Sequence, residues 1–352
     1  MPEPANEPAN DTDRSEPTGP ADPTAPARQS NRTGEPSPAA KLLRFQQPEK
    51  TLRYLGELSD DRLAGLFGLD GDTYRARLRA YDDQVRETAA GLLEDPSFAE
   101  RVGRLPFRPG QLVVALGEST TADRLSWCEV LRHLLPEDVR LVNLAVSGLT
   151  TTQALAQLPQ LSRFRPDWIL CMIGANDTQR LGRSPGAPGT RLVSAAETER
   201  NLHALRALAA PDAADRWVWL TPSGVDQARA DSYPHFLRAG IGWAAEDTDG
   251  IADFLLGRPE PTVDTRPVTA GLHIDDGVHL TPEGQRAIAV ALVDTLTDHT
   301  PPGVTTDHTP PDAATDHTSS GVTTERTPPD AATGRTALVA PVEPVPSRAV
   351  AS

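Results

Sequence analysis

Four short segments of the chain are nearly continuous apolar runs. They cover residues 112–116, 141–146, 168–173 and 217–220. Strands of a parallel sheet have this composition because helices cover both faces of the sheet, so that side chains pointing either way are buried. The pattern therefore predicts four buried parallel strands in the middle of the chain.

Between these runs, apolar residues recur every three or four positions, as they do on the buried face of a helix. The residues that carry this spacing are Leu125, Cys128, Leu131, Leu135, Leu155, Leu158, Leu202, Leu205, Leu208, Ile288, Leu292 and Leu296. Strand connections of this kind are right-handed, which places the loop after each strand at one edge of the sheet. The alternation predicts an α/β fold with helices on both faces of the sheet.

A further helical pattern precedes the first strand. Its apolar stripe comprises Tyr74, Leu78, Tyr81, Val85 and Leu92, and Ser59 and Asp72 are the predicted caps. Residues 41–105 are therefore expected to form a helical extension. Core packing is the simplest role for such a stripe, and a lid over a cleft or a dimer surface remains open.

Between residues 231 and 269 we expect a helix, a short extended piece and a second helix.

Both ends of the chain differ from its middle. Residues 1–40 and 297–352 each contain nine of the 34 prolines and no aromatic residue, so neither end can bury enough apolar surface to offset the entropy of ordering. The C-terminal segment also repeats every nine residues, from Asp298-His299-Thr300-Pro301-Pro302 onward. We predict two disordered tails, a helical extension over 41–105 and one α/β domain over 106–296, and the partners of the tails remain open.

Charge and composition exclude several classes of protein. The net charge of −15 leaves no basic segment for a nucleic-acid surface. No run of 18 apolar residues is present, and the start Met1-Pro2-Glu3-Pro4 does not resemble a secretory signal, so we expect a cytoplasmic protein without a membrane span. Cys128 and Cys171 are expected to be buried reduced thiols, and no Cys/His spacing indicates a metal site.

The candidate chemistry lies in two distant motifs. Gly117-Glu118-Ser119 follows the first apolar run, and Asp276-Gly277-Val278-His279 precedes the last helix. A serine hydroxyl needs a base to accept its proton as it attacks, and histidine titrates in the suitable range. An acidic residue three positions earlier can hold one ring nitrogen while the other faces the hydroxyl. Ser119, His279 and Asp276 are therefore the candidate nucleophile, base and orienting acid.

Two other strand-end loops carry candidate hydrogen-bond donors. The second run ends at Ser147-Gly148, and the third is followed by Gly174-Ala175-Asn176-Asp177. Acyl transfer passes through a tetrahedral oxyanion, which is stabilised by donors already aimed at the developing charge. The backbone N–H groups of Ser119 and Gly148 and the side-chain amide of Asn176 are the three candidates for this oxyanion hole.

These four motifs together resemble the SGNH hydrolases of the GDSL esterase and lipase family. The resemblance covers roughly residues 111–296, with Ser119, Gly148, Asn176 and His279 (with Asp276) in the four blocks. It implies a three-layer, flavodoxin-like parallel sheet and a serine esterase or acylhydrolase that acts on a small-molecule ester without metal or organic cofactor. Glu118 stands where that family usually has aspartate, so its hydrogen bonds must be aimed differently.

Other interpretations of these residues stay open. Ser119 could only cap a helix, and His273 is a rival base that lacks an acid three positions before it. Ser147 and Ser223 are further serines, but the chain has no Gly-x-Ser-x-Gly motif. An acyltransferase would use the same three groups, and a non-catalytic binding or scaffold protein could keep the fold.

Overall fold

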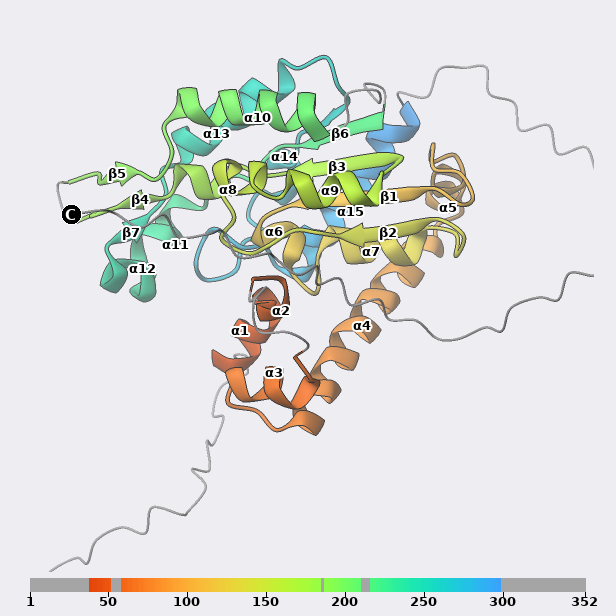
Figure 1. Cartoon of the computed structure of the whole chain (residues 1–352), viewed down its shortest axis with the longest axis horizontal. Coiled ribbons are helices and arrows are strands. Elements are labelled where there is room, and N and C mark those ends of the chain that lie inside the picture. Colours follow the sequence, from red (N-terminus) through yellow and green to blue (C-terminus); the bar gives the residue numbers. More distant parts are fainter. Residues whose placement is uncertain (1–37, 52–57, 185–186, 210–215, 299–352) are drawn as a thin grey trace, which may run out of the picture. The chain divides into compact units, whose positions relative to one another are not determined.

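The computed structural model describes residues 38–51, 58–184, 187–209 and 216–298 (Figure 1). Most of both predicted tails lies outside these residues, and so do the nine-residue repeats and their histidines. The described residues form an α/β fold around a five-stranded parallel sheet. Its strands are β1 (Leu112–Gly117), β2 (Arg140–Asn143), β3 (Trp168–Met172), β6 (Trp217–Leu220) and β8 (Thr262–Val263).

The strand order is β2-β1-β3-β6-β8, and every neighbouring pair is parallel. Counted along the chain this is the 2-1-3-4-5 order of flavodoxin-like sheets, so the predicted fold class is confirmed. In such a sheet the chain runs from β1 to β2 on one side of β1 and then crosses to β3 on the other side. A crevice therefore forms at the carboxyl ends of β1 and β3. The loops carrying Ser119 and Asn176 follow these two strands.

Side chains of each strand alternate between two apolar layers. Val113, Leu170 and Val218 face one cluster, whereas Val114, Cys171 and Trp219 face the other. Figure 1 shows α10 and α13 on one side of the sheet and α7 and α4 on the other. Helices α4 (Gly71–Leu93), α5 (Pro96–Gly103), α7 (Trp127–Leu134) and α15 (Pro282–Asp298) cover the first face. Helices α8 (Thr151–Leu155), α9 (Leu158–Phe164), α10 (Ala195–Ala209) and α13 (Ala245–Leu256) cover the second.

The predicted helical extension is present as helices that precede β1. They are α1 (Pro38–Phe45), α2 (Pro48–Thr51), α3 (Asp60–Leu66) and the long α4 and α5. Leu43, Leu63, Ala64 and Tyr74 form a small apolar cluster of their own. Tyr81 packs against both this cluster and the main core, and its hydroxyl donates to the carbonyl of Ala40 (3.1 Å), so α1 is joined to α4.

The remaining elements lie in the loops after the strands. Strands β4 (Arg180–Leu181), β5 (Thr190–Arg191) and β7 (Ile241–Gly242) form a small antiparallel sheet. The short helices are α6 (Ser119–Ala122), η1 (Ala175–Thr178), α11 (Gln227–Ser232), α12 (Pro234–Ala239) and α14 (Arg266–Thr269). The predicted order of helix, extended piece and helix after residue 231 corresponds to α12, β7 and α13.

Some predicted boundaries were wrong for local reasons. Strand β2 ends at Asn143 because the side-chain oxygen of this residue accepts from the N–H of Ala145 (3.0 Å) and bends the chain. The N-cap of α4 is Asp70, not Asp72, since its carboxylate accepts from the N–H of Thr73 (2.8 Å). Strand β8 was missed because two residues are too few to show a period.

Candidate active site

Ser119, His279 and Asp276 form a continuous hydrogen-bonded line at the carboxyl edge of the sheet. The Ser119 Oγ lies 3.0 Å from His279 Nε2, and His279 Nδ1 lies 2.9 Å from Asp276 Oδ2. Because a carboxylate only accepts, Nδ1 carries the hydrogen, and Nε2 is left to accept from the serine hydroxyl. The structure thus brings together two motifs that are 160 positions apart in the sequence.

A tight turn fixes the acid and the histidine relative to each other. Asp276 Oδ1 accepts from the N–H groups of Val278 (3.0 Å) and His279 (2.9 Å). Gly277 adopts a φ of 69°, and a Cβ at this position would lie 2.6 Å from the Ala230 nitrogen. Glycine is therefore required by both the conformation and the space.

Asp276 is buried and nevertheless charged. Burial alone would raise its pKa, but the hydrogen bond and charge of His279, the His279 N–H and the charge of Lys41 outweigh burial and hold the pKa well below its usual range. The Asp276 carboxylate is therefore ionised at neutral pH, which strengthens the hydrogen bond that it accepts from Nδ1.

The helices that follow Ser119 and His279 are clamped to each other. Gln285, at the start of α15, accepts from the N–H of Trp127 (3.0 Å) and donates to the carbonyl of Thr120 and to Asp123 Oδ2 (both 3.1 Å). The hydroxyl of Thr281 accepts from the N–H of Gly284 (3.3 Å) and so caps the start of this helix. One amide side chain thus joins the segment that carries Ser119 to the segment that carries His279.

The predicted backbone donors lie at the starts of helical turns or in open loops. Ser119 is the first residue of α6, and its N–H has no acceptor within the described residues. Gly148 has a φ of 80°, and its N–H likewise finds no acceptor there. A Cβ at Gly148 would meet no atom within 4 Å, so its conformation, rather than crowding, selects glycine.

Glu118 connects the serine loop to the Asn176 loop. Its carboxylate accepts from the N–H of Ala175 (3.0 Å), the N–H of Asn176 (3.2 Å) and the side-chain amide of Asn176 (2.9 Å). The same amide also donates to the carbonyl of Leu149 (3.2 Å). Both amide hydrogens of Asn176 thus have acceptors. To donate to a substrate oxygen, the amide must give up one of these bonds, and the bond to Leu149 is the longer of the two.

Three other contacts at the site involve residues that the sequence motifs did not indicate. Lys41 of α1 lies 3.2 Å from Asp276 Oδ2, and its ammonium donates to the Tyr233 hydroxyl (2.9 Å). The Trp243 indole N–H donates to the carbonyl of Ala175 (3.0 Å). The scarcity of lysine could have drawn attention to Lys41, since Lys41 and Lys50 are the only two lysines in the chain.

The rival residues have other partners. His273 is buried, and its Nε2 donates to the carbonyl of Gly224 (2.7 Å). The Ser147 hydroxyl donates to the carbonyl of Phe45. Among the serines considered, Ser119 is the one hydrogen-bonded to a histidine within the described part of the chain.

Residues 115–287 match the sequence profile of the GDSL-like Lipase/Acylhydrolase family. The chain carries a GDSL-like lipase/acylhydrolase domain. The match begins within β1, covers all four loops that hold the candidate residues, and ends in the N-terminal half of α15. The GDSL-like domain belongs to a family of hydrolases.

Solved structures similar to the GDSL-like domain include a lipase/acylhydrolase from Enterococcus faecalis (18% identity, 53% of this chain and 96% of that chain, TM-score 0.42). A mutant of an acetyl-xylooligosaccharide esterase from Geobacillus Stearmophilus is 20% identical over 53% of this chain and 94% of that chain, with a TM-score of 0.41. A putative acylhydrolase from Bacteroides fragilis is 16% identical over 57% and 94%, with a TM-score of 0.42. No curated protein matches the sequence closely.

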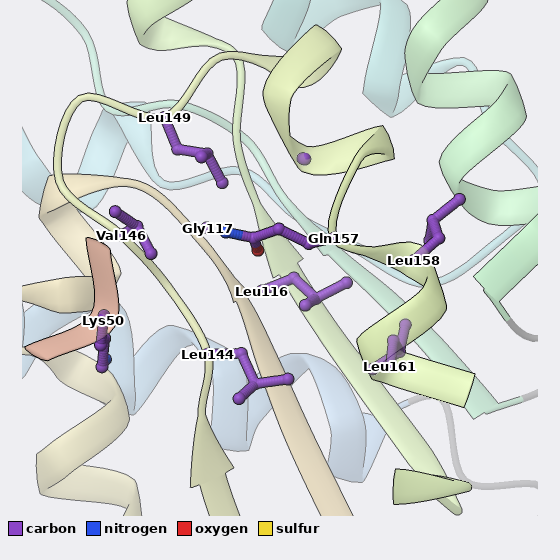
Figure 2. A pocket seen from close by; sticks show the side chains of 10 residues that line it. Lys50, Leu116, Gly117, Leu144, Val146, Leu149, Gln157, Leu158 and Leu161 are labelled. Atoms are coloured by element: carbon purple, nitrogen blue, oxygen red, sulfur yellow. The ribbon is translucent and has the colours of Figure 1, made fainter. Parts of the chain in front are cut away.

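An apolar pocket of about 150 Å³ lies between the ends of β1 and β2 and the helices α8 and α9 of the GDSL-like domain. Figure 2 shows Lys50 and Val146 on one side of this pocket and Leu158 and Leu161 on the other. Gly117 and Leu149 also line it, and they are close in sequence to Ser119 and Gly148.

Glu118, the acidic residue before Ser119, is buried. Removal from water raises the pKa of Glu118 to about 8. The N–H groups of Asn176, Ala175 and Gly174 act in the opposite direction, and the nearby Asp177 adds to the rise. Glu118 thus binds its proton far more tightly in the folded domain than a glutamate in water, whose ordinary value is 4.5.

Replacing Glu118 with glutamine should remove a pH dependence of stability. As the pH rises from 4.5, the unfolded chain releases this proton first, and the folded state follows at about 8. The wild-type protein therefore loses stability across this window, by an amount on the order of 4 kcal/mol, and the glutamine variant does not. Urea unfolding of both proteins at pH 5, 6, 7 and 8 measures the difference between them.

Glu246→Gln, at an exposed position of α13, controls for the loss of one surface acid. A wild-type minus Glu118→Gln difference that stays constant from pH 5 to pH 8 would contradict the raised pKa.

Cys128 and Cys171 are both free and buried, which confirms the prediction from sequence. Within the described residues, no helix is long and apolar enough to cross a membrane.

Proposed function

We propose that this protein is a serine ester hydrolase that works through an acyl-enzyme intermediate. The observation that supports this most directly is the line of hydrogen bonds from Ser119 Oγ to His279 Nε2 (3.0 Å) and from His279 Nδ1 to Asp276 Oδ2 (2.9 Å). A nucleophile, a base within hydrogen-bond reach and an ionised group that orients the base are the three parts that this chemistry needs.

In the first half of the reaction, Ser119 Oγ attacks the acyl carbon of the ester while His279 Nε2 accepts the hydroxyl proton. Asp276 holds the Nδ1–H and stabilises the positive charge that the ring acquires. The tetrahedral intermediate then expels the alcohol, which takes the proton from Nε2. The acyl group stays on Ser119 as an ester.

In the second half, a water molecule attacks the acyl carbon and gives a proton to His279 Nε2. Collapse of the second tetrahedral intermediate releases the carboxylic acid, and the Ser119 oxygen regains the proton from His279. Both halves pass through an oxyanion. The N–H groups of Ser119 and Gly148 are the first two donors for it, since neither has an acceptor within the described residues.

Asn176 is the proposed third donor. Its amide donates to Glu118 at 2.9 Å and to the carbonyl of Leu149 at 3.2 Å. An oxyanion is a stronger acceptor than a neutral carbonyl, so the bond to Leu149 is the one that exchanges as charge develops on the substrate. The bond from the Asn176 amide to Glu118 stays in place during this exchange and keeps the amide oriented. The Glu118 side chain, one methylene longer than the usual aspartate, reaches Asn176 to accept this bond.

We propose a substrate with a small acyl group. The apolar pocket behind Gly117 and Leu149 is about 150 Å³ and is lined by leucine, valine and alanine side chains. This volume suits a short acyl chain. Lys50 and Gln157 are also part of its wall and limit its apolar extent.

A fluorophosphonate probe tests the proposed function directly. The probe phosphonylates a serine whose hydroxyl is activated by a base, and peptide mapping then locates the label. We expect the label on Ser119 and its loss in His279→Ala, because that variant keeps the hydroxyl and removes the base.

Ser232→Ala, at an exposed position of α11, is the matched control and should label like the wild-type protein. A label on Ser147 or Ser223, or a label that persists in His279→Ala, would refute the proposal.

A further inference from the structure

The N-terminal segment formed by α1 and α2 contacts the candidate active site although it lies outside the matched GDSL-like domain. Lys41 of α1 lies 3.2 Å from Asp276 Oδ2. This is the same carboxylate oxygen that accepts from His279 Nδ1 at 2.9 Å. One oxygen of the orienting acid is thus shared between the imidazole and an ammonium group.

Tyr233 holds this ammonium in place. Its hydroxyl accepts from the Lys41 ammonium at 2.9 Å, and the nitrogen lies 4.7 Å from the centre of the Tyr233 ring. The Lys41 side chain is 28% exposed, compared with 3% for that of Asp276. Burial lowers the pKa of Lys41, but the bond to Tyr233 and the charge of Asp276 outweigh it and raise the pKa, so Lys41 stays charged.

A second residue of α1 packs on the histidine itself. The centres of the Phe45 and His279 rings are 4.5 Å apart, with an angle of 39° between the ring planes. Phe45 is buried, so this face of the imidazole is covered by an aromatic ring instead of water. An imidazole packed in this way cannot rotate freely about its side-chain bonds.

The rest of the segment is attached to three of the four loops that carry candidate residues. Arg44 forms two bonds with Asp123 after α6, at 2.8 and 2.6 Å, and donates to the carbonyl of Leu280 (2.9 Å). Gln47 donates to the carbonyl of Ala122. Lys50 donates to the carbonyl of Ala145 (3.0 Å), three residues before Gly148. These bonds join α1 and α2 to the loops that carry Ser119, Gly148 and His279.

We propose that Lys41 is a positioning residue of this hydrolase, which acts through Asp276 to orient His279 and to limit the negative charge that His279 experiences. This inference rests on the proposed function. Phe45 supports the same ring from the side. The active site is then built jointly by the GDSL-like domain and by helix α1.

The effect of Lys41 on pH dependence has a definite sign. Asp276 favours the protonated imidazole, and the ammonium on the same oxygen offsets part of that negative charge. Removing the ammonium therefore makes the histidine easier to protonate. His279 then keeps its proton, and cannot act as a base, up to a higher pH. The acidic limb of the activity profile therefore shifts to higher pH.

Other charged or titratable groups lie on the segments near His279, and the test leaves all of them in place. They are Asp276 on its own turn, Arg44 on α1, Tyr233 before α12, Glu118 and Asp123 at the two ends of α6, and Asp226, Arg229 and His273 in the neighbouring loops.

The test compares Lys41→Met and Lys41→Arg in the full chain, with the pH profile of kcat/KM for a small chromogenic ester as the readout. We expect Lys41→Met to lower kcat by about 10- to 100-fold with little change in KM, because positioning is lost and binding is not. The midpoint of the acidic limb should rise by about one pH unit. Lys41→Arg keeps the charge and should restore the midpoint to the wild-type value.

Arg86→Met is the matched control, since Arg86 is an exposed cation of α4 that pairs with Asp82 and Asp83. Phe45→Leu provides a second variant, with an apolar side chain but no ring; it should lower kcat and leave the acidic midpoint in place. Thermal unfolding of each variant identifies any that fail to fold.

Two failures are distinguishable. Absence of fluorophosphonate labelling in the wild-type protein would overturn the proposed function. A labelled, active wild-type protein whose Lys41→Met variant keeps the wild-type acidic midpoint would overturn the role of Lys41 alone, and so would a fall in kcat with no shift of the limb.

Discussion

Alanine at position 119 should lower kcat for ester hydrolysis by roughly 10⁴- to 10⁶-fold. The reason is that the hydroxyl bonded to His279 Nε2 is the atom that attacks the substrate in the proposed reaction. Without it, the oxyanion donors can still assist direct attack by water, so a small residual rate is expected. Steady-state hydrolysis of a chromogenic ester measures the loss.

The two residues should also act as a unit. His279→Ala removes the base from the same step, so the double variant should be hardly slower than either single variant. Additive losses in the double variant would mean that Ser119 and His279 contribute separately. That result would be inconsistent with the hydrogen bond of 3.0 Å between them being used in the reaction.

Asp276→Asn should lower kcat by roughly 10⁴-fold while the fold is kept. The side chain keeps its shape, but an amide in place of the carboxylate no longer stabilises the charged imidazole. It can also present an N–H group to Nδ1, which favours the tautomer whose hydrogen faces Ser119. The kcat at pH 8 and the unfolding temperature are the two measurements.

Asp275→Asn, at the exposed neighbouring position, is the matched control and should keep wild-type activity. A loss of less than about tenfold in Asp276→Asn would show that His279 needs no orienting acid. A large fall in the unfolding temperature would mean that the four donors around this buried carboxylate mainly support the fold.

The central sheet was predictable because its strands are buried on both faces. Trp217–Leu220 consists of four fully buried apolar residues, and the observed strand has the same limits as the predicted one. Strand β8 has two residues, and the small sheet of β4, β5 and β7 has two in each strand. Such elements are held by pairing with distant strands, which leaves no local pattern in the sequence.

The candidate residues were predictable from motifs because each motif is local. The sequence Asp276-Gly277-Val278-His279 specifies its own turn, since Asp276 accepts from two of its N–H groups and Gly277 supplies the positive φ. The contact between Lys41 and Asp276 spans 235 positions, and only the packing of α1 against the domain creates it. No spacing rule in the sequence describes such a contact.

The clamp at Gln285 bears on how such a chain can change during evolution. The amide of this residue connects α15 to the carbonyl of Thr120 and to Asp123, so a direct contact joins the segments that carry Ser119 and His279, which are 160 positions apart in the sequence. Insertions or deletions in the surface loops beyond Asp123 would leave this contact in place. In the proposed hydrolase, the substrate range can then change through those loops while the hydrogen bond between Ser119 and His279 is kept.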